Sequence, residues 1–165
     1  MPLIIPANTL SDAGYTIANS VRMNDGDTPY FSKTPTAGDR AKWTFSCWFK
    51  IGVMPFDAHN LITAGASGAY DETTIRIDSQ VIDWVEYDDS ATAVVGRLTT
   101  NRKIRDPSGW YHLVCTWDSD NASAGNRMRM YINGTEETSF STDTNPGSGY
   151  DSAMSSNVLH EIGRQ

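Results

Sequence analysis

The sequence predicts an all-β protein in which two antiparallel sheets pack against each other as a sandwich. Short runs alternate apolar with polar residues at a period of two, and turn-forming Gly, Asn, Asp and Ser residues separate these runs. No segment shows the apolar periodicity of an amphipathic helix. With 165 residues, the chain is most simply one domain that buries a substantial core.

About ten short runs satisfy this strand pattern. Strands are expected at residues 20–23, 30–32, 42–51, 61–63, 73–78, 81–87, 93–99, 110–117, 127–133 and 157–162. Residues 1–18 precede them and are expected to form an extended arm, which leaves residues 19–165 for the folded domain. Many short strands with intervening turns favour a two-sheet sandwich over a single flat sheet.

Three of these runs predict which side chains face the core. Residues 42–51 place apolar side chains on one face and polar side chains, together with Trp48, on the other. Residues 110–117 (WYHLVCTW) are apolar on both faces, which is typical of a central strand. His112 lies within that run, and we expect a hydrogen-bonded core or interface histidine there. Residues 127–133 send three apolar side chains one way and Arg129 and Tyr131 the other.

The segment from Thr73 to Tyr87 predicts a hairpin. A two-residue turn at residues 79–80 would place Ile77 opposite Ile82, Arg76 opposite Asp83 and Ile75 opposite Trp84. That register puts the apolar pairs on one face and an opposite-charge pair on the other. Such a charge pair contributes roughly 0.2–1 kcal/mol and mainly fixes the register.

Composition argues against several classes of partner. The formal net charge of −7, with no basic run, argues against nucleic acid, because phosphate binding requires a basic face. The apolar residues 1–6 lack the basic region of a signal peptide, and no run is long enough to span a membrane. Nucleotide-binding and nucleophile motifs are missing from the sequence, and no His/Cys pair has metal-ligand spacing.

Three motifs, in this order along the chain, resemble the Concanavalin A-like family, in particular its laminin-G and pentraxin-type jelly rolls. The family strand F-T-x-S-x-W-x-K is similar to Trp43–Lys50, W-x-H-x-x-x-T-W-D to Trp110–Asp118, and L-Y-V-N-G to Met130–Gly134. The resemblance covers roughly residues 18–163 and implies a two-sheet antiparallel jelly-roll sandwich.

A narrower resemblance is to a subgroup found in virion proteins of tailed phages. Those proteins often begin with an apolar arm like residues 1–10 and contain segments like residues 19–25 and 105–111. This resemblance implies a non-enzymatic virion protein, located on the outer surface or in a tail fibre, that adheres to host or environmental glycans. The alternative is a purely architectural capsid-decoration or joining domain without a sugar ligand; a glycan hydrolase ranks third.

The family also places a closing strand after a sequence like Glu161–Gly163, and the given sequence stops at Gln165 before such a strand. Either the sequence is a fragment of a longer protein, or another chain completes the sheet. An unpaired sheet edge invites the addition of another strand. The apolar residues Leu3, Ile4 and Ile5 lie between two prolines and are expected to dock in an assembly. The expected partners are other virion proteins or copies of this chain; the competing possibility is that the arm packs on its own sandwich.

The run VIDWVEY (residues 81–87) resembles the catalytic strand of laminarinase-type glucanases, but with departures. The family's nucleophile position is occupied here by Val81. Asp83 and Glu86 would point to opposite faces of a regular strand, whereas a retaining glycosidase needs two carboxyl groups roughly 5–5.5 Å apart. No catalytic residue is therefore expected.

Exposed aromatic side chains are the candidate sugar contacts. Trp48, Trp84, Tyr131 and Tyr87 could stack on a pyranose ring, with Arg129 beside Tyr131. For Trp48 and Trp84 we favour packing over sugar binding, with Trp48 beneath a loop and Trp84 opposite Ile75. Trp48, Arg129 and Tyr131 remain the weak glycan-binding candidates.

Two further residue pairs have alternative interpretations. Asp118 and Asp120 carry oxygen ligands that suit Ca²⁺, which laminin-G and pentraxin relatives often bind, but a solvated hairpin loop is favoured. Cys47 and Cys115 lie in the strands that carry the pentraxin disulfide, each displaced by one position. Equal shifts in an antiparallel pair separate the partners, so both thiols are expected to be reduced and buried.

Overall fold

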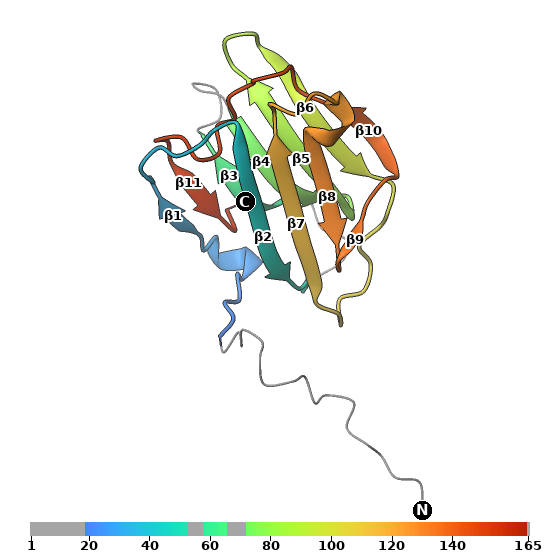
Figure 1. Cartoon of the computed structure of the whole chain (residues 1–165). Helices are drawn as coiled ribbons and strands as arrows, with labels where there is room; N and C mark the ends of the chain where they lie inside the picture. The colour runs from blue at the N-terminus through green and yellow to red at the C-terminus, as the bar shows by residue number, and fades with distance from the viewer. Residues whose placement is uncertain (1–18, 53–57, 66–71, 165) are drawn as a thin grey trace, which may run out of the picture.

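In the computed structural model, residues 19–52, 58–65 and 72–164 are described, and their strands form two antiparallel sheets (Figure 1). The strands are β1 (Phe31–Lys33), β2 (Lys42–Phe49), β3 (His59–Ala64), β4 (Glu72–Asp78), β5 (Val81–Asp88), β6 (Ala93–Thr100), β7 (Tyr111–Asp118), β8 (Met128–Ile132), β9 (Thr135–Glu136), β10 (Phe140–Thr144) and β11 (His160–Ile162). Two 3-10 turns, η1 (Asp25–Asp27) and η2 (Ala124–Asn126), complete the regular structure of this part of the chain. None of its helices is long and apolar enough to cross a membrane.

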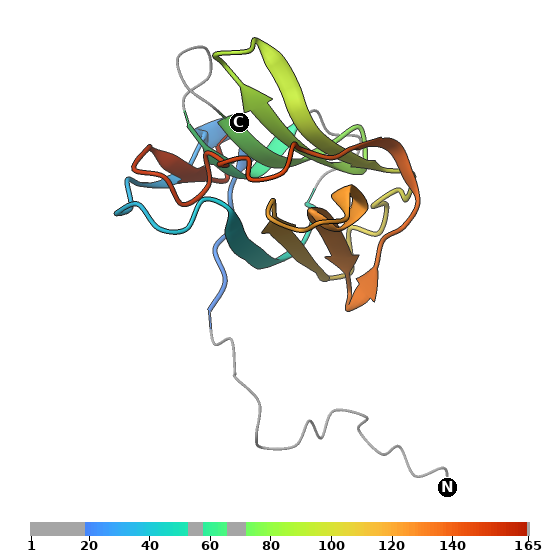
Figure 2. The ribbon, with the colours of Figure 1, turned by 45° about the horizontal axis from the view of Figure 1, so that its top comes forward.

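The two sheets differ in width. The larger sheet has seven strands in the order β1-β11-β3-β4-β5-β6-β10, and the smaller has four in the order β2-β7-β8-β9. The sheets lie face to face, as the turned view in Figure 2 shows, so the prediction of an all-β sandwich is confirmed. In Figure 1, β11 and β1 lie to the left of β2, beyond the edge of the smaller sheet.

The β4–β5 hairpin has the register that the sequence predicts. Ile77 lies opposite Ile82, Arg76 opposite Asp83, and Ile75 opposite Trp84. The turn residues Ser79 and Gln80 have φ values of 50° and 71°, the left-handed conformation that a tight two-residue hairpin turn requires.

The inner faces of both sheets form one core. Trp43 of β2, Trp84 of β5 and Trp117 of β7 meet there, with ring centroids 5.3–6.1 Å apart. Isoleucine and leucine side chains of β4, β5, β6 and β7 are buried around them. The alternation predicted for residues 42–51 is confirmed, because Trp43, Phe45 and Phe49 pack on this core.

The strand prediction failed at three places. Residues 20–23 form no strand, and the chain there runs irregularly into η1. The sequence patterns missed β9 and β10, because β9 has two residues and β10 (FSTDT) is a polar edge strand with little burial. The prediction that residues 110–117 form a central strand is confirmed, since β7 lies between β2 and β8, and the outer face of β7 is half-buried. A strand therefore needs neither alternation nor two covered faces when its neighbours supply the ladder.

Candidate functional site

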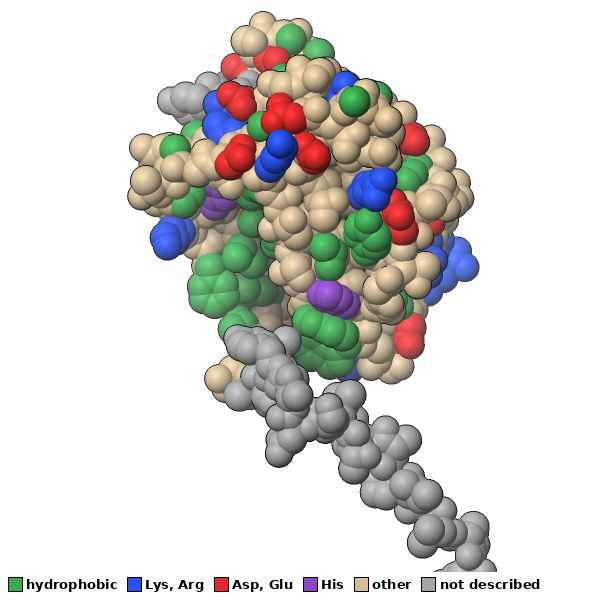
Figure 3. All heavy atoms as spheres, viewed as in Figure 1, with side chains coloured by type: hydrophobic (Ala, Val, Ile, Leu, Met, Phe, Trp, Pro, Cys, Tyr) green, Lys and Arg blue, Asp and Glu red, His purple; other side chains and the backbone are tan. Residues whose placement is uncertain are grey.

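The outer face of the smaller sheet carries most of the candidate sugar contacts. We call Ser46, Trp48, His112, Val114 and Tyr131 the Trp48 face. Trp48 of β2 lies directly opposite His112 of β7, and Ser46 lies opposite Val114, which in turn lies opposite Tyr131 of β8. Because side chains alternate along a strand, all five point away from the core. Figure 3 views this face and shows a histidine among hydrophobic side chains on it.

Trp48 is 52% exposed, so the expectation that it packs beneath a loop was wrong. Its indole stacks on the His112 imidazole with ring centroids 4.7 Å apart and planes 14° apart. The His112 Nε2 lies 2.9 Å from the Ser46 hydroxyl. His112 is thus hydrogen-bonded as expected, but on the outer face instead of in the core. The stack thus fixes the Trp48 indole against the neighbouring strand β7 and leaves Trp48 half-exposed.

Arg129 and Tyr131 lie further across the same sheet, on β8. The Arg129 Nη2 donates to Asn126 Oδ1 at 2.6 Å, and its Nε lies 3.6 Å from Glu136 Oε1. The hydrogen bond with Tyr131, and then the charge of Glu136, raise the pKa of Arg129. The guanidinium is therefore held in place beside Tyr131 and keeps its charge.

Trp110 is an exposed aromatic residue that the sequence reasoning did not select. It precedes β7 by one residue, is 50% exposed, and continues the alternation that places His112 outward. Its position in an apolar run suggested burial, whereas the structure places its side chain on the outer face of the smaller sheet. In contrast, Trp84 is fully buried and cannot meet a sugar, as expected, while Tyr87 is half-buried on the larger sheet.

The candidate calcium ligands Asp118 and Asp120 flank a lysine. Lys42 Nζ lies 3.1 Å from Asp120 Oδ2 and 3.9 Å from Asp118 Oδ1. The hydrogen bond to Asp120 and the two carboxylate charges raise the pKa of Lys42, so a positive charge already sits between these oxygens. Within the described ranges, no group of three or more His, Cys, Asp or Glu side chains could hold a metal ion. Calcium binding stays a prediction, which a titration of the domain with the metal would test.

Asp83 is held by two arginines on the outer face of the larger sheet. Arg76 donates to Oδ2 from Nε at 3.1 Å and from Nη2 at 2.9 Å. Arg97 donates from Nε to Oδ1 at 2.9 Å and from Nη2 to Oδ2 at 3.1 Å. The Thr99 hydroxyl donates to Oδ1 at 2.7 Å. With every lone pair engaged and a side-chain exposure of 2%, this carboxylate is a structural ion-pair partner.

Glu86 points to the opposite side of β5, as strand alternation predicts. Its carboxylate accepts hydrogen bonds from the Thr73 hydroxyl at 2.7 Å, the Ser152 hydroxyl at 3.1 Å and the Ala153 backbone N–H at 2.9 Å. These contacts attach the segment around residues 152–154 to the inner face of the larger sheet. The two carboxylates of VIDWVEY thus belong to separate networks on opposite faces.

Both cysteines are free, as predicted. Cys115 is buried between the sheets and Cys47 is half-buried on the same inner side. Phe45 lies opposite Cys115 and Leu113 lies opposite Cys47, so the two cysteines are diagonal neighbours. Burial raises the pKa of the Cys47 thiol to about 12 and that of Cys115 well above its ordinary value. The arm residues Leu3, Ile4 and Ile5 lie outside the described residues.

Comparison with known proteins agrees with this geometry. The fold is similar to the heptameric SAP-like pentraxin of Limulus polyphemus, with a TM-score of 0.54 at 16% identity over 85% of this chain and 59% of that chain. It is also similar to domains LG4-5 of the mouse laminin alpha1 chain, with a TM-score of 0.56 at 9% identity over 79% of this chain and 31% of that chain. This chain therefore spans less than two thirds of either. No curated protein sequence matches it. A family model matches residues 24–158, and the chain thus belongs to the Concanavalin A-like lectin/glucanases superfamily.

Proposed function

We propose that this domain binds glycans without cleaving them, and that the Trp48 face is the contact surface. One observation carries the proposal: Trp48 presents half of its indole to solvent while His112 and the β2–β7 ladder hold it in a fixed orientation. An aromatic face buries the apolar C–H side of a pyranose, and a ring that is already ordered loses little entropy on binding. Membership of a lectin-type superfamily is consistent with such a role.

Polar groups beside the indole can set the orientation of a sugar. The Ser46 hydroxyl and the His112 imidazole lie next to Trp48, and the Tyr131 hydroxyl and the Arg129 guanidinium lie across the sheet. Sugar sites combine an aromatic surface with a few such hydrogen-bonding groups. The Trp48 face is open, so we expect it to contact a few sugar residues of an oligosaccharide instead of enclosing a monosaccharide.

The non-enzymatic part of the proposal rests on Asp83 and Glu86. Asp83 is saturated by Arg76, Arg97 and Thr99, and Glu86 is committed to the inside of the sandwich. A retaining hydrolase needs one carboxylate free as a nucleophile and one as an acid, both beside the same bond. Neither of these carboxylates is available for such a role.

The finer biological setting is proposed from sequence resemblance alone. We propose a virion protein of a tailed phage, placed on the outer surface or in a fibre, where glycan binding would serve adhesion. Other virion proteins or copies of the chain would be its partners. A purely architectural domain is the second candidate: it would be favoured if a segment of a neighbouring chain occupied the open edge of β2, since an added strand there would join the two chains.

A glycan array probed with the labelled domain tests the sugar proposal. We expect binding to at least one oligosaccharide class, and we expect Trp48→Ala to weaken it by roughly tenfold or more, which corresponds to about 1.4 kcal/mol. Phe31→Ala is the matched control, because Phe31 is 53% exposed but lies on β1 of the other sheet. A domain that binds no glycan, or a Trp48→Ala variant that binds as well as the unmodified chain, would overturn the proposal.

A further inference from the structure

β2 is the open edge of the smaller sheet. Across the described residues, it pairs with β7 alone. The Ser119 N–H donates to the Ala41 carbonyl at 3.0 Å, which shows that odd-numbered residues turn their backbone groups toward β7. The even-numbered residues of β2 therefore turn theirs to the open side. The Lys42 N–H is taken up by Asp39 Oδ1 at 3.1 Å, which leaves the backbone groups of Thr44, Ser46 and Trp48 on that side.

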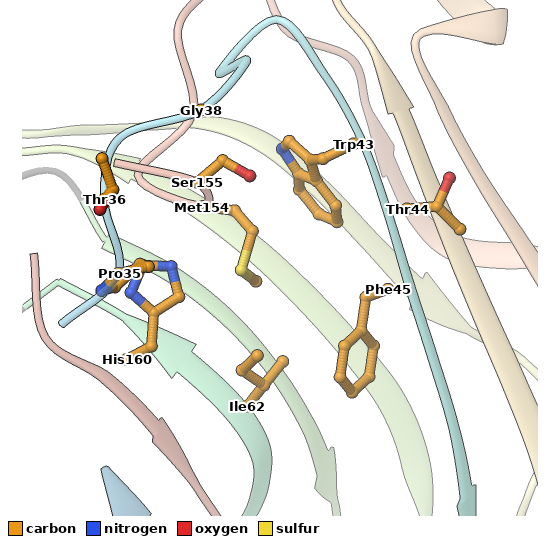
Figure 4. Close-up of a pocket in the computed structure, with 10 residues that line it drawn as sticks. All are labelled: Pro35, Thr36, Gly38, Trp43, Thr44, Phe45, Ile62, Met154, Ser155 and His160. Atoms are coloured by element: carbon orange, nitrogen blue, oxygen red, sulfur yellow. The ribbon is translucent and has the colours of Figure 1, made fainter. Parts of the chain in front are cut away.

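Next to this edge, the sandwich is hollow. A pocket of about 320 Å³ lies between the sheets. Its lining includes Trp43 and Phe45 of β2, Ile62 of β3, His160 of β11 and Met154. Figure 4 shows the aromatic rings of β2 on one side of this space and Ile62, Met154 and His160 facing them. An open edge beside an apolar hollow is the geometry that an added strand fills, with its backbone on the edge and alternate side chains inward.

The shape of the space selects the kind of occupant. The larger sheet extends past β2 by way of β11 and β1 (Figure 1), so one face of the gap is already walled. A second copy that paired its own β2 with this edge would lie about 4.8 Å away. It would bring its own β11 and β1 into the volume that these strands already fill. A single extended segment fits, whereas a second sandwich does not.

We propose that residues 2–6 of the same chain (Pro-Leu-Ile-Ile-Pro) occupy this edge as an added strand. The described chain begins at residue 19, just before η1, near the end of β2 that carries Phe49 (Figure 1). Residues 7–18 form a tether of up to roughly 40 Å when extended, and β2 is roughly 26 Å long. The segment therefore reaches the whole edge, and tethering gives it a high effective concentration there.

The spacing of the prolines fits a strand with one open side. Pro2, Ile4 and Pro6 share one parity, while Leu3 and Ile5 share the other. When Leu3 and Ile5 turn their backbone groups toward β2, the prolines face away, where no N–H is needed. We place the strand parallel to β2, the direction that leaves Pro6 at the Phe49 end, nearest residue 19. In a parallel pair, Leu3 and Ile5 lie beside Trp43 and Phe45 and project inward, into the pocket. Proline on the new outer edge would also block further strand addition.

Hydrogen–deuterium exchange on the whole chain tests this proposal, with deletion of residues 2–10 as the comparison. We expect the amides of Thr44 and Ser46 to exchange roughly tenfold or more faster after the deletion. The amides of Phe45 and Cys47, which turn toward β7, are the control within the same strand and should change far less. Equal exchange of Thr44 and Ser46 in the two chains would overturn the proposal, provided that circular dichroism shows both to be folded.

Point variants test whether Leu3 and Ile5 are the side chains that project inward. Light scattering tests whether the added strand comes from the same chain or from a second copy. Leu3→Asp and Ile5→Asp should each reproduce the faster exchange of the deletion, whereas Ile4→Asp should leave protection intact. The protected chain should be monomeric, with protection independent of protein concentration. Protection found only in a dimer would contradict docking within one chain, as would equal effects of the three substitutions. None of these readouts depends on sugar binding, so failure here leaves the glycan proposal standing.

Discussion

Replacing Asp83 with Asn tests whether the two-arginine cluster stabilises the larger sheet. The carboxylate receives four guanidinium hydrogen bonds of 2.9–3.1 Å and one hydroxyl bond of 2.7 Å. Charge-assisted hydrogen bonds contribute roughly 1.5–3 kcal/mol each in favourable sites, but they are not additive. Asn keeps the shape of the side chain, removes the charge, and leaves Arg76 and Arg97 facing each other.

The expected magnitude follows from burial. Breaking a fully buried ion pair costs roughly 3–5 kcal/mol. Here Asp83 is buried, but the side chains of Arg76 and Arg97 are 30% and 37% exposed, so water screens part of the uncompensated charge. We therefore expect Asp83→Asn to lower the free energy of unfolding by about 3 kcal/mol. For a chain of this size, that loss corresponds to a fall in Tm of roughly 6–12 °C.

Urea and thermal unfolding, followed by circular dichroism, measure the effect. Asp143→Asn is the matched control: Asp143 lies in β10 of the same sheet, is exposed, and, among the described residues, accepts only a local hydrogen bond from Asn145. Its effect should stay within about 0.5 kcal/mol. In a double-mutant cycle, Asp83→Asn with Arg97→Gln should cost less than the sum of the two single changes. A loss at Asp83 as small as at Asp143, or strict additivity, would refute the reasoning.

Two further predictions concern the thiols and one turn. At pH 8, Cys47 and Cys115 should react with a thiol reagent only slowly in the folded domain, because burial raises the pKa of both thiols. Unfolding the domain without a reductant should expose two reactive thiols. Finding no reactive thiol after unfolding would show a disulfide. Gly134 has φ +79° in the turn between β8 and β9, so Gly134→Ala should lower the free energy of unfolding by about 1 kcal/mol. At Gly147, φ lies outside the left-handed region and an added Cβ would meet no atom within 4 Å. Gly147→Ala should therefore lower the free energy of unfolding less than Gly134→Ala in the same urea assay.

Local patterns predicted the larger features of the fold well. The β4–β5 register could be read from the sequence because a two-residue turn fixes which residues lie opposite each other, and the alternation of Ile77 and Arg76 fixes which face is buried. The partner found this way for Asp83 was Arg76. Arg97 was missed, since it comes from β6, whose pairing with β5 contains a register shift between Glu86 and Tyr87. Counting residues cannot anticipate such a bulge.

The candidate site was only partly predictable. The alternation in β2 correctly placed Trp48 on the outer face, but the resemblance to family members suggested a loop above it. Whether a face is covered depends on segments distant in sequence, and the alternation within β2 cannot predict where those segments lie. The same reason explains Glu86, whose partners Ser152 and Ala153 come from near the end of the described chain. Trp110 was missed because an apolar run fits a buried strand as well as one with an exposed aromatic end.

The pairing of β2 with β7 also has a kinetic consequence. β3, β4, β5 and β6 are consecutive in the chain and adjacent in the larger sheet, so each of their pairings closes only a short loop. β2 and β7 are neighbours in the smaller sheet, although that whole meander separates them in sequence. Closing a long loop costs more entropy, and contacts distant in sequence slow folding. Trp48 and His112 come from these two strands, so an intermediate that contains only the meander lacks their stacked pair. The Trp48 face therefore exists only once β2 has paired with β7.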